Sequence, residues 1–270
     1  MRLDAPESGI PPLYALYFSH IVNRMDSGTS RYNSVLDLGC GKDLKELRIL
    51  DLLGIPLCVG IDVREKPNLT RGTSRLTESC CVGANLPFLV IQRDRELAVH
   101  YIRADIDEYH LPVADCSFDL VMINNTIEHL HRPREVVEEC KRVLKVDGDL
   151  LILTPNQAQI SNRLRLLIGR SIYYPIDYWL GEGEEHFYRN GRRYFAGHVR
   201  EYTVSELERL LRLVGFEIDD VRFFSSVEVP ESRKLPVFRK VKSVLLRLIE
   251  RAVPRTRYMI SIIARKSDVP

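Results

Sequence analysis

The segment Asp37-Leu38-Gly39-Cys40-Gly41 places a carboxylate and two glycines directly after an apolar run. Glycines let the backbone approach a ligand closely, and a helix that starts behind them points its N–H groups at that ligand. A dinucleotide site would need a third glycine at position 44, where Leu44 stands, and the carboxylate of Asp37 would repel a pyrophosphate. The pattern favours a ligand with a cationic or neutral end, such as an amino-acid group.

A second set of side chains, later in the chain, could exchange protons or contact a substrate. Its members are Glu128, His129, Asn156, His198 and Tyr202. For Glu128 and His129 the favoured interpretation is structural, as a pair that forms local hydrogen bonds where a helix starts. Arg200 could bind an acidic substrate or form a salt bridge. For each of these residues, a role in the chemistry and a structural role both stay open.

The elements that must position these residues alternate between strands and helices. Ser34 to Leu38, a glycine turn, a helix over 44–53 and a strand over 56–63 make a βαβ unit, which implies parallel pairing. We expect further strands at 99–104, 118–124, 150–154, 216–224 and 257–265, and helices at 13–25, 133–144 and 203–214. Thr203 and Glu206 form a capping box for the last helix. Residues 64–98 predict an irregular excursion with at most one short helix.

The length and the composition fit a globular protein with one decorated domain or two small ones, and the order of the expected elements predicts one α/β domain over 1–270. Its core spans about 31–225 plus the last strand. An insert covers about 157–198, where we expect a short helix from Arg163 to Ile168 and then an aromatic-rich loop. The net charge of +2 gives nucleic-acid binding no support. No run of about 18 apolar residues could span a membrane, and no signal peptide is expected at the start. The six cysteines form no C-x-x-C pair, which indicates reduced thiols and a cytoplasmic location.

Beyond these patterns, the sequence resembles class I methyltransferases that depend on S-adenosylmethionine. Val35 to Gly41 is similar to the first motif of that family. Four later segments resemble its other motifs in the same order: Ala104-Asp105-Ile106, Leu111 to Leu130, Lys141 to Asn156, and His198 to Phe216. The resemblance covers about residues 31–225. It implies a doubly wound, mostly parallel seven-stranded sheet in the order 3-2-1-4-5-7-6, with the last strand antiparallel.

The resemblance also implies which residues hold S-adenosylmethionine. The first motif contributes Asp37, Gly39, Cys40 and Gly41. Asp62, at the end of the second strand, would accept hydrogen bonds from the ribose hydroxyls. Asp105 and Ile106 would meet the adenine, and Asn124 would lie beside the cofactor. Two departures are Asp43, which replaces the third glycine of the first motif, and the long interval from Asp62 to Asp105.

The acceptor of the methyl group is not identified by these motifs. We expect O-methylation of a small molecule, a sugar or a lipid-linked intermediate, with Glu128, His129 and His198 as the candidate catalytic residues. Some related O-methyltransferases carry E-x-x-E-H as Mg²⁺ ligands; here Asn125 replaces the first acid, so no metal site is expected. The alternatives are a catalytically silent interaction module and a nicotinamide-dependent reductase.

The segment Val237 to Ala252 has apolar residues on one helical face and many basic residues around it. The favoured interpretation is a helix packed on the sheet with a solvated basic face. Peripheral contact with an anionic membrane, or with a lipid-linked acceptor, is the alternative. Nucleic-acid binding is the least favoured.

Overall fold

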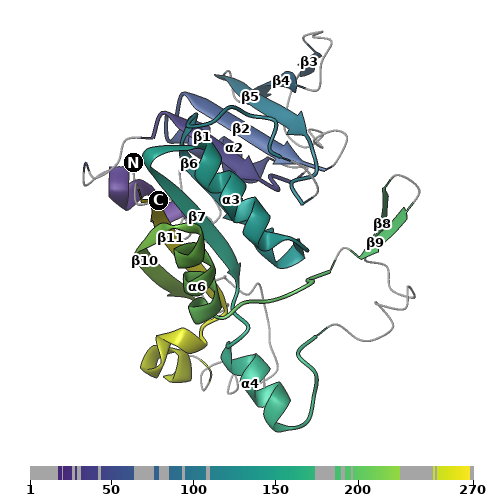
Figure 1. Cartoon of the computed structure of the whole chain (residues 1–270), viewed down its shortest axis with the longest axis vertical. Helices are drawn as coiled ribbons and strands as arrows, with labels where there is room; N and C mark the ends of the chain where they lie inside the picture. Colours follow the sequence, from purple (N-terminus) through teal and green to yellow (C-terminus); the bar gives the residue numbers. More distant parts are fainter. Residues whose placement is uncertain are drawn as a thin grey trace.

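The structure is a computed structural model (Figure 1). It describes residues 18–19, 21–25, 28, 32–41, 44–63, 76–78, 85–92, 95–107, 110–173, 186–189, 192–195, 197–225, 246 and 248–267. The start of the helix expected at 13–25 and most of the helix expected at 237–252 lie outside these residues. Among the described residues, no helix is long and apolar enough to cross a bilayer.

A nine-stranded sheet forms the centre of the molecule, in the order β10-β11-β7-β6-β1-β2-β5-β4-β3. From β5 to β10 this is the seven-strand order that the resemblance implied. The pairs among β5, β2, β1, β6 and β7 are parallel, and β11 is antiparallel to both of its neighbours. The strands are β1 (Ser34–Leu38), β2 (Leu57–Asp62), β3 (Leu76–Glu78), β4 (Asn85–Gln92), β5 (Arg95–Arg103), β6 (Phe118–Asn124), β7 (Leu144–Pro155), β10 (Phe216–Phe224) and β11 (Met259–Lys266).

The expectation of an irregular excursion over 64–98 is wrong for the part that the structure describes. β3 and β4 lie in this stretch, and β5 starts at Arg95 rather than at Val99. β4 pairs antiparallel with β5 from Asn85–Ile102 to Gln92–Arg95, so the two strands form a hairpin that extends the edge of the sheet. Asn85 to Gln92 does not alternate strictly between apolar and polar residues and contains a proline, so its sequence does not indicate a strand. The strand depends on its pairing with β5.

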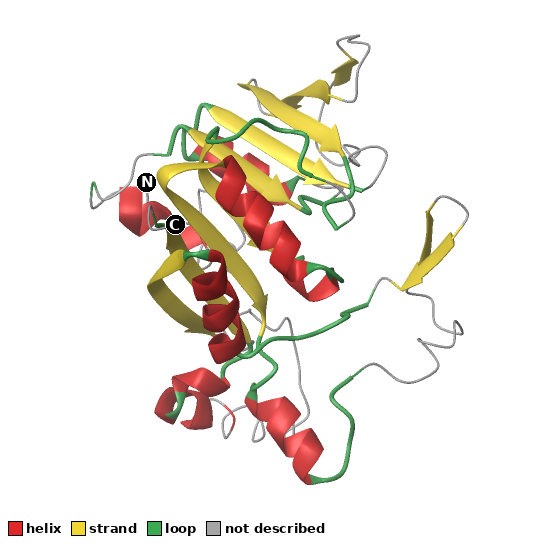
Figure 2. Ribbon diagram, viewed as in Figure 1, coloured by secondary structure: helices red, strands yellow, loops and turns green. Residues whose placement is uncertain are grey.

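Helices cover both faces of the sheet (Figure 2). On one face, α2 (Lys45–Leu52) and the helical residues 21–25 pack through Leu47, Leu50 and Ile21. On the other, α3 (Pro133–Val143) and α6 (Val204–Val214) pack through residues such as Val137 and Leu207. The capping box of Thr203 and Glu206 is present, as predicted, and α6 ends at Gly215 with φ of 89°.

The insert over 157–198 contains regular structure that the sequence indicated only in part. α4 (Ile160–Leu167) begins three residues before the expected position of Arg163. A hairpin of β8 (His186–Arg189) and β9 (Arg192–Phe195) forms where a loop was expected, and Figure 1 draws it apart from the main sheet. β7 (Leu144–Pro155) also starts earlier than the expected strand at 150–154. It includes Asp147 and Gly148, where the register to β6 shifts.

Candidate functional site

Asp37, on β1, is a buried carboxylate that lacks partners. Its side chain is 1% exposed, and neither carboxylate oxygen has a hydrogen-bond partner among the residues that the structure describes. Burial raises the pKa of this carboxyl well above its ordinary value, and the charges of Glu46 and Asp62 raise it further. An unpaired buried carboxylate is unfavourable, so this position calls for a ligand that brings hydrogen-bond donors or a positive charge.

The glycine turn that follows β1 requires glycine for two reasons, its backbone conformation and a close approach to another loop. Gly39 and Gly41 have φ of 77° and 67°, in the left-handed region that favours glycine. A Cβ added at Gly39 would lie 2.3 Å from Oγ1 of Thr126, in the loop after β6. The need for glycine at position 39 therefore comes from this approach of two loops, and not only from the space that a ligand would fill.

Asp62, at the end of β2, faces the same turn. Its Oδ2 accepts a hydrogen bond from the backbone N–H of Gly41 at 2.9 Å, and its backbone carbonyl accepts one from Ala104 at 3.1 Å. The predicted ribose-binding acid therefore also holds the glycine turn and the end of β5 in place.

The remaining predicted cofactor residues lie around the same edge. Asp105 and Ile106 are half-buried in the turn after β5, where Oδ1 of Asp105 accepts the N–H of Asp107 at 2.9 Å. Asn124 ends β6. Cys40 is buried, and a Cβ added at Gly60 would lie 2.6 Å from its Sγ. The thiol of Cys40 therefore points into the protein, and only its backbone could face a ligand.

Glu46, in the first turn of α2, is a site residue that the sequence interpretation missed. Nδ2 of Asn124 donates to its Oε1 at 2.8 Å, which links α2 to the end of β6. Its charge also acts on Asp37. An acid in the first turn of the helix behind a glycine loop was the available signal.

A second cluster joins Glu128 and His129 to His198, although seventy positions separate them in the chain. One ligand atom from each of the three lies within 4.8 Å of the others. The backbone carbonyl of Glu128 accepts hydrogen bonds from the N–H groups of Val199 and Arg200, at 2.8 and 3.1 Å, and this brings His198 to η2 (Ile127–His129). The rings of His129 and His198 meet edge to face with centroids 5.0 Å apart.

The hydrogen bonds of the two histidines define their neutral tautomers. Nδ1 of His129 lies 3.0 Å from the carbonyl oxygen of Gly197, and Nδ1 of His198 lies 3.1 Å from Oε1 of Glu201. Both partners are acceptors, so each Nδ1 carries the proton and each Nε2 is the basic nitrogen. Neither Gly197 nor Glu201 was identified from the sequence.

Glu128 is the buried acid of this cluster. It is 1% exposed; Oε2 accepts from Oγ1 of Thr154 at 2.9 Å, and Oε1 has no partner among the described residues. Burial raises the pKa of its carboxyl. The cluster can accept protons. It could also hold a divalent cation, although one carboxylate with two imidazoles suits a transition metal better than Mg²⁺.

The other proton-exchange candidates have structural partners. Nδ2 of Asn156 donates to the carbonyl oxygens of Arg255 and Arg257 at 2.9 and 2.8 Å. Arg200 forms a salt bridge with Glu206 and stacks over the ring of Tyr202 at 5.4 Å, so the salt-bridge alternative is the one observed.

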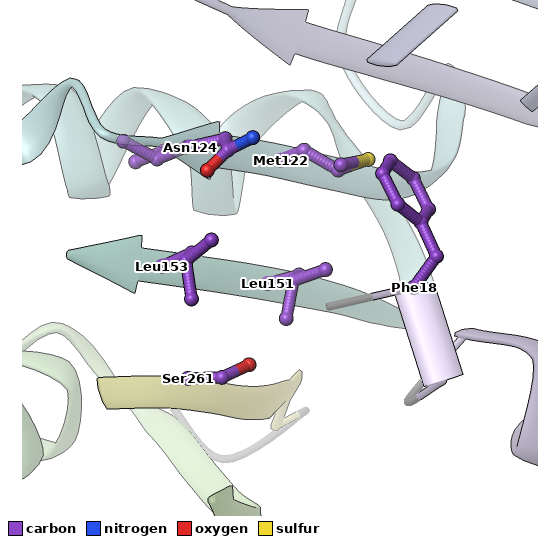
Figure 3. Close-up of a pocket in the computed structure, with 7 residues that line it drawn as sticks. Phe18, Met122, Asn124, Leu151, Leu153 and Ser261 are labelled. Carbon is purple, nitrogen blue, oxygen red and sulfur yellow. The ribbon is translucent and has the colours of Figure 1, made fainter. Parts of the chain in front are cut away.

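A narrow cavity lies beside the cofactor edge, among β6, β7 and β11 (Figure 3). Its walls are Phe18, Met122, Ile123, Asn124, Leu151, Leu153 and Ser261. The cavity measures about 10 Å³, which is close to the least volume that holds one water molecule. It is too small for a substrate, so the chemistry belongs to the strand ends rather than to this cavity.

Comparisons with known proteins agree with this geometry. A family model described as a methyltransferase domain matches residues 14–221. A probable S-adenosylmethionine-dependent methyltransferase of Mycolicibacterium smegmatis is 32% identical over 123 residues, 44% of this chain and 38% of the relative. A demethylmenaquinone methyltransferase of Thermotoga maritima is 29% identical over 125 residues, 45% of this chain and 52% of the relative. The chain therefore spans about half or less of these relatives' lengths.

A solved structure shows the shared fold. An S-adenosylmethionine-dependent methyltransferase of Listeria monocytogenes superimposes with a TM-score of 0.53 and 19% identity, over 95% of this chain and 99% of that one. Because the family model covers most of the chain, the protein belongs to the methyltransferase-domain family. The Mycolicibacterium smegmatis relative is itself named as dependent on S-adenosylmethionine. The unpartnered oxygens of Asp37 fit this cofactor, whose amino-acid end carries an ammonium group.

Proposed function

We propose that the protein transfers a methyl group from S-adenosylmethionine to a hydroxyl of a small molecule, a sugar or a lipid-linked intermediate. The observation that carries this proposal is Asp37, a buried carboxylate with two unpartnered oxygens beside the glycine turn. A cationic amino-acid end supplies the donors that this carboxylate lacks. Asp62 would bind the ribose, and Asp105 and Ile106 would contact the adenine.

In this proposal the cluster of Glu128, His129 and His198 lies beside the molecule that receives the methyl group and takes up its proton. S-adenosylmethionine supplies an activated methyl group, so the protein mainly positions the two reactants and excludes water. The hydroxyl oxygen forms a bond to the methyl carbon as the carbon–sulfur bond breaks, and S-adenosylhomocysteine leaves. Nε2 of His198 or His129 accepts the hydroxyl proton, which is the role that their tautomers allow.

Two features support an acceptor that is not a nucleic acid and a reaction that needs no added metal. The net charge of +2 provides no broad basic field. Asn125 carries no charge, and its Nδ2 donates to Oδ1 of Asn124 at 3.0 Å, so Glu128 is the one acid of the cluster. The relative from Thermotoga maritima is named for a quinone acceptor, which is a small molecule.

The test has two stages. Isothermal titration with S-adenosylmethionine and with NADPH comes first: binding of S-adenosylmethionine alone is expected, while binding of NADPH alone would favour a reductase. Binding of neither would favour a silent interaction module. The second stage incubates the protein and its Asp37→Asn variant with methyl-labelled cofactor and a fractionated cell extract. Label in one small-molecule or lipid fraction with the wild type only is the expected result, and label in protein or nucleic acid would contradict the acceptor class.

A further inference from the structure

The end of α4 and the residues after it expose an unusual concentration of apolar side chains. Leu164, Leu166, Leu167, Ile168 and Tyr173 are 42%, 57%, 82%, 66% and 55% exposed. These five account for nearly half of the large apolar side chains that the described part of the chain exposes. Contiguous exposed apolar patches on a folded protein mark interaction sites.

α4 has its apolar face turned away from the protein. Its one buried residue is Asn162, whose Nδ2 donates to the carbonyl oxygen of Gln157 at 3.0 Å and to Oε2 of Glu201 at 3.2 Å. Residues on a helix follow each other at about 100°, so Leu164 and Leu167 point roughly opposite to Asn162. A polar residue therefore anchors this helix, and its leucines face outward. Figure 2 shows α4 at the lower end of the molecule, clear of the sheet.

The charge around this apolar face has one sign. Arg163, Arg165 and Arg170 are all exposed, and no acidic residue occurs from position 157 to position 176. An apolar stripe with arginines on both sides is the composition of a helix that lies in the interface of an anionic bilayer.

A second segment repeats this composition at the same end of the molecule. Leu248 and Val253 are 57% and 48% exposed, and Arg251 and Arg255 are exposed beside them. The acid of this segment, Glu250, is buried and accepts a hydrogen bond from the hydroxyl of Ser225. The hydrogen bonds of Asn156 to the carbonyls at 255 and 257 tie this segment to the residues just before α4.

We propose that α4 and residues 248–258 together form a surface that binds anionic lipid bilayers. The two segments supply aliphatic side chains for the acyl boundary and arginines for the headgroups. This inference does not depend on the proposed methyl transfer, but the proposed surface lies close to the candidate acceptor site. Asn162 contacts Glu201, which in turn contacts His198, so the surface starts one hydrogen-bonded residue away from the candidate acceptor site.

Vesicle co-sedimentation of the full chain tests this surface. Vesicles of phosphatidylcholine alone are compared with vesicles that contain phosphatidylglycerol, at 0.05 M and 0.5 M NaCl. We expect binding to the anionic vesicles that weakens at high salt, because the Debye length shortens. Leu164→Ser/Leu167→Ser and Arg165→Glu/Arg170→Glu should each weaken this binding by roughly tenfold or more.

Matched controls come from α6, which exposes the same residue types. Leu213 is 67% exposed, and Arg209 and Arg212 are exposed, so Leu213→Ser and Arg209→Glu/Arg212→Glu should leave vesicle binding unchanged. Circular dichroism checks that every variant is folded. Absence of binding to anionic vesicles at low salt would overturn the proposal, as would equal losses in the α4 and α6 variants. A dimer in sedimentation velocity that Leu164→Ser/Leu167→Ser makes monomeric, without vesicle binding, would assign the surface to a second copy instead.

Discussion

The backbone N–H of Gly41 donates to Oδ2 of Asp62 at 2.9 Å, so the acid that ends β2 holds the turn that ends β1. One carboxylate thus connects two strand ends at the proposed cofactor site. Substitutions at Asp62 are expected to affect both the turn and the cofactor, and two variants can separate these effects.

Asp62→Ala should weaken S-adenosylmethionine binding by about 1–3 kcal/mol, because the ribose hydroxyls and the Gly41 N–H lose an acceptor. Asp62→Asn keeps an oxygen for Gly41 and should lose less. Isothermal titration measures both, with urea unfolding as the check on stability. An unchanged dissociation constant in a folded Asp62→Ala protein would show that the ribose is bound elsewhere.

Gly39→Ala should lower the free energy of unfolding by about 2–4 kcal/mol, the sum of a left-handed backbone and an overpacked contact. The added Cβ would meet the side chain of Thr126 at 2.3 Å. In the Gly39→Ala/Thr126→Gly double variant the steric part should be recovered, as measured by a double-mutant cycle in urea. Strict additivity of the two substitutions would mean that the loops do not press on each other.

Asp37→Asn should stabilise the cofactor-free protein and impair its function. The folded pKa of Asp37 lies above its unfolded value, so its stabilising effect is complete below the unfolded pKa and is lost as the pH rises through the folded pKa. At neutral pH burial disfavours the charge of this carboxyl, which the variant lacks, so the variant should gain about 1–2 kcal/mol. Thermal unfolding from pH 4 to 8 should show a falling stability for the wild type that the variant lacks. Tight binding of S-adenosylmethionine by Asp37→Asn would refute the ammonium contact.

His198→Gln should lower kcat by about 10²- to 10⁴-fold once an acceptor is known, because the proposed base is removed. The dissociation constant of S-adenosylmethionine should not change, since His198 lies in the other cluster. His110→Gln is the control, because its side chain is 90% exposed. An equal loss of activity in both variants would argue against a base at position 198.

Methyl transfer should persist in EDTA, because the cluster of Glu128, His129 and His198 offers a single carboxylate. The measurement is the initial rate after dialysis against EDTA, followed by addition of Mg²⁺, Mn²⁺ or Zn²⁺ in separate samples. Loss of activity in EDTA and its recovery with one of these ions would show that the cluster is a metal site.

The sequence by itself determined the elements whose pattern is local. β1 and β6 have the bounds that their largely apolar runs predicted, and α6 starts and ends where Thr203, Glu206 and Gly215 predicted. These signals are strong because a buried strand needs an unbroken apolar run, and a helix end needs groups that satisfy its N–H and carbonyl groups.

Tertiary structure alone decided which distant residues meet. Three contacts join segments that are far apart in the chain, and no local spacing encodes them: Gly39 with Thr126, Glu46 with Asn124, and Glu128 with His198. The outer strands depend on pairing in the same way, because β3 pairs with β4 and β4 pairs with β5. The periodicity of a helix shows that it has an apolar face but not what covers that face. Leu164 and Leu167 are therefore exposed on α4, although the same spacing of three residues buries Val137 and Cys140 on α3.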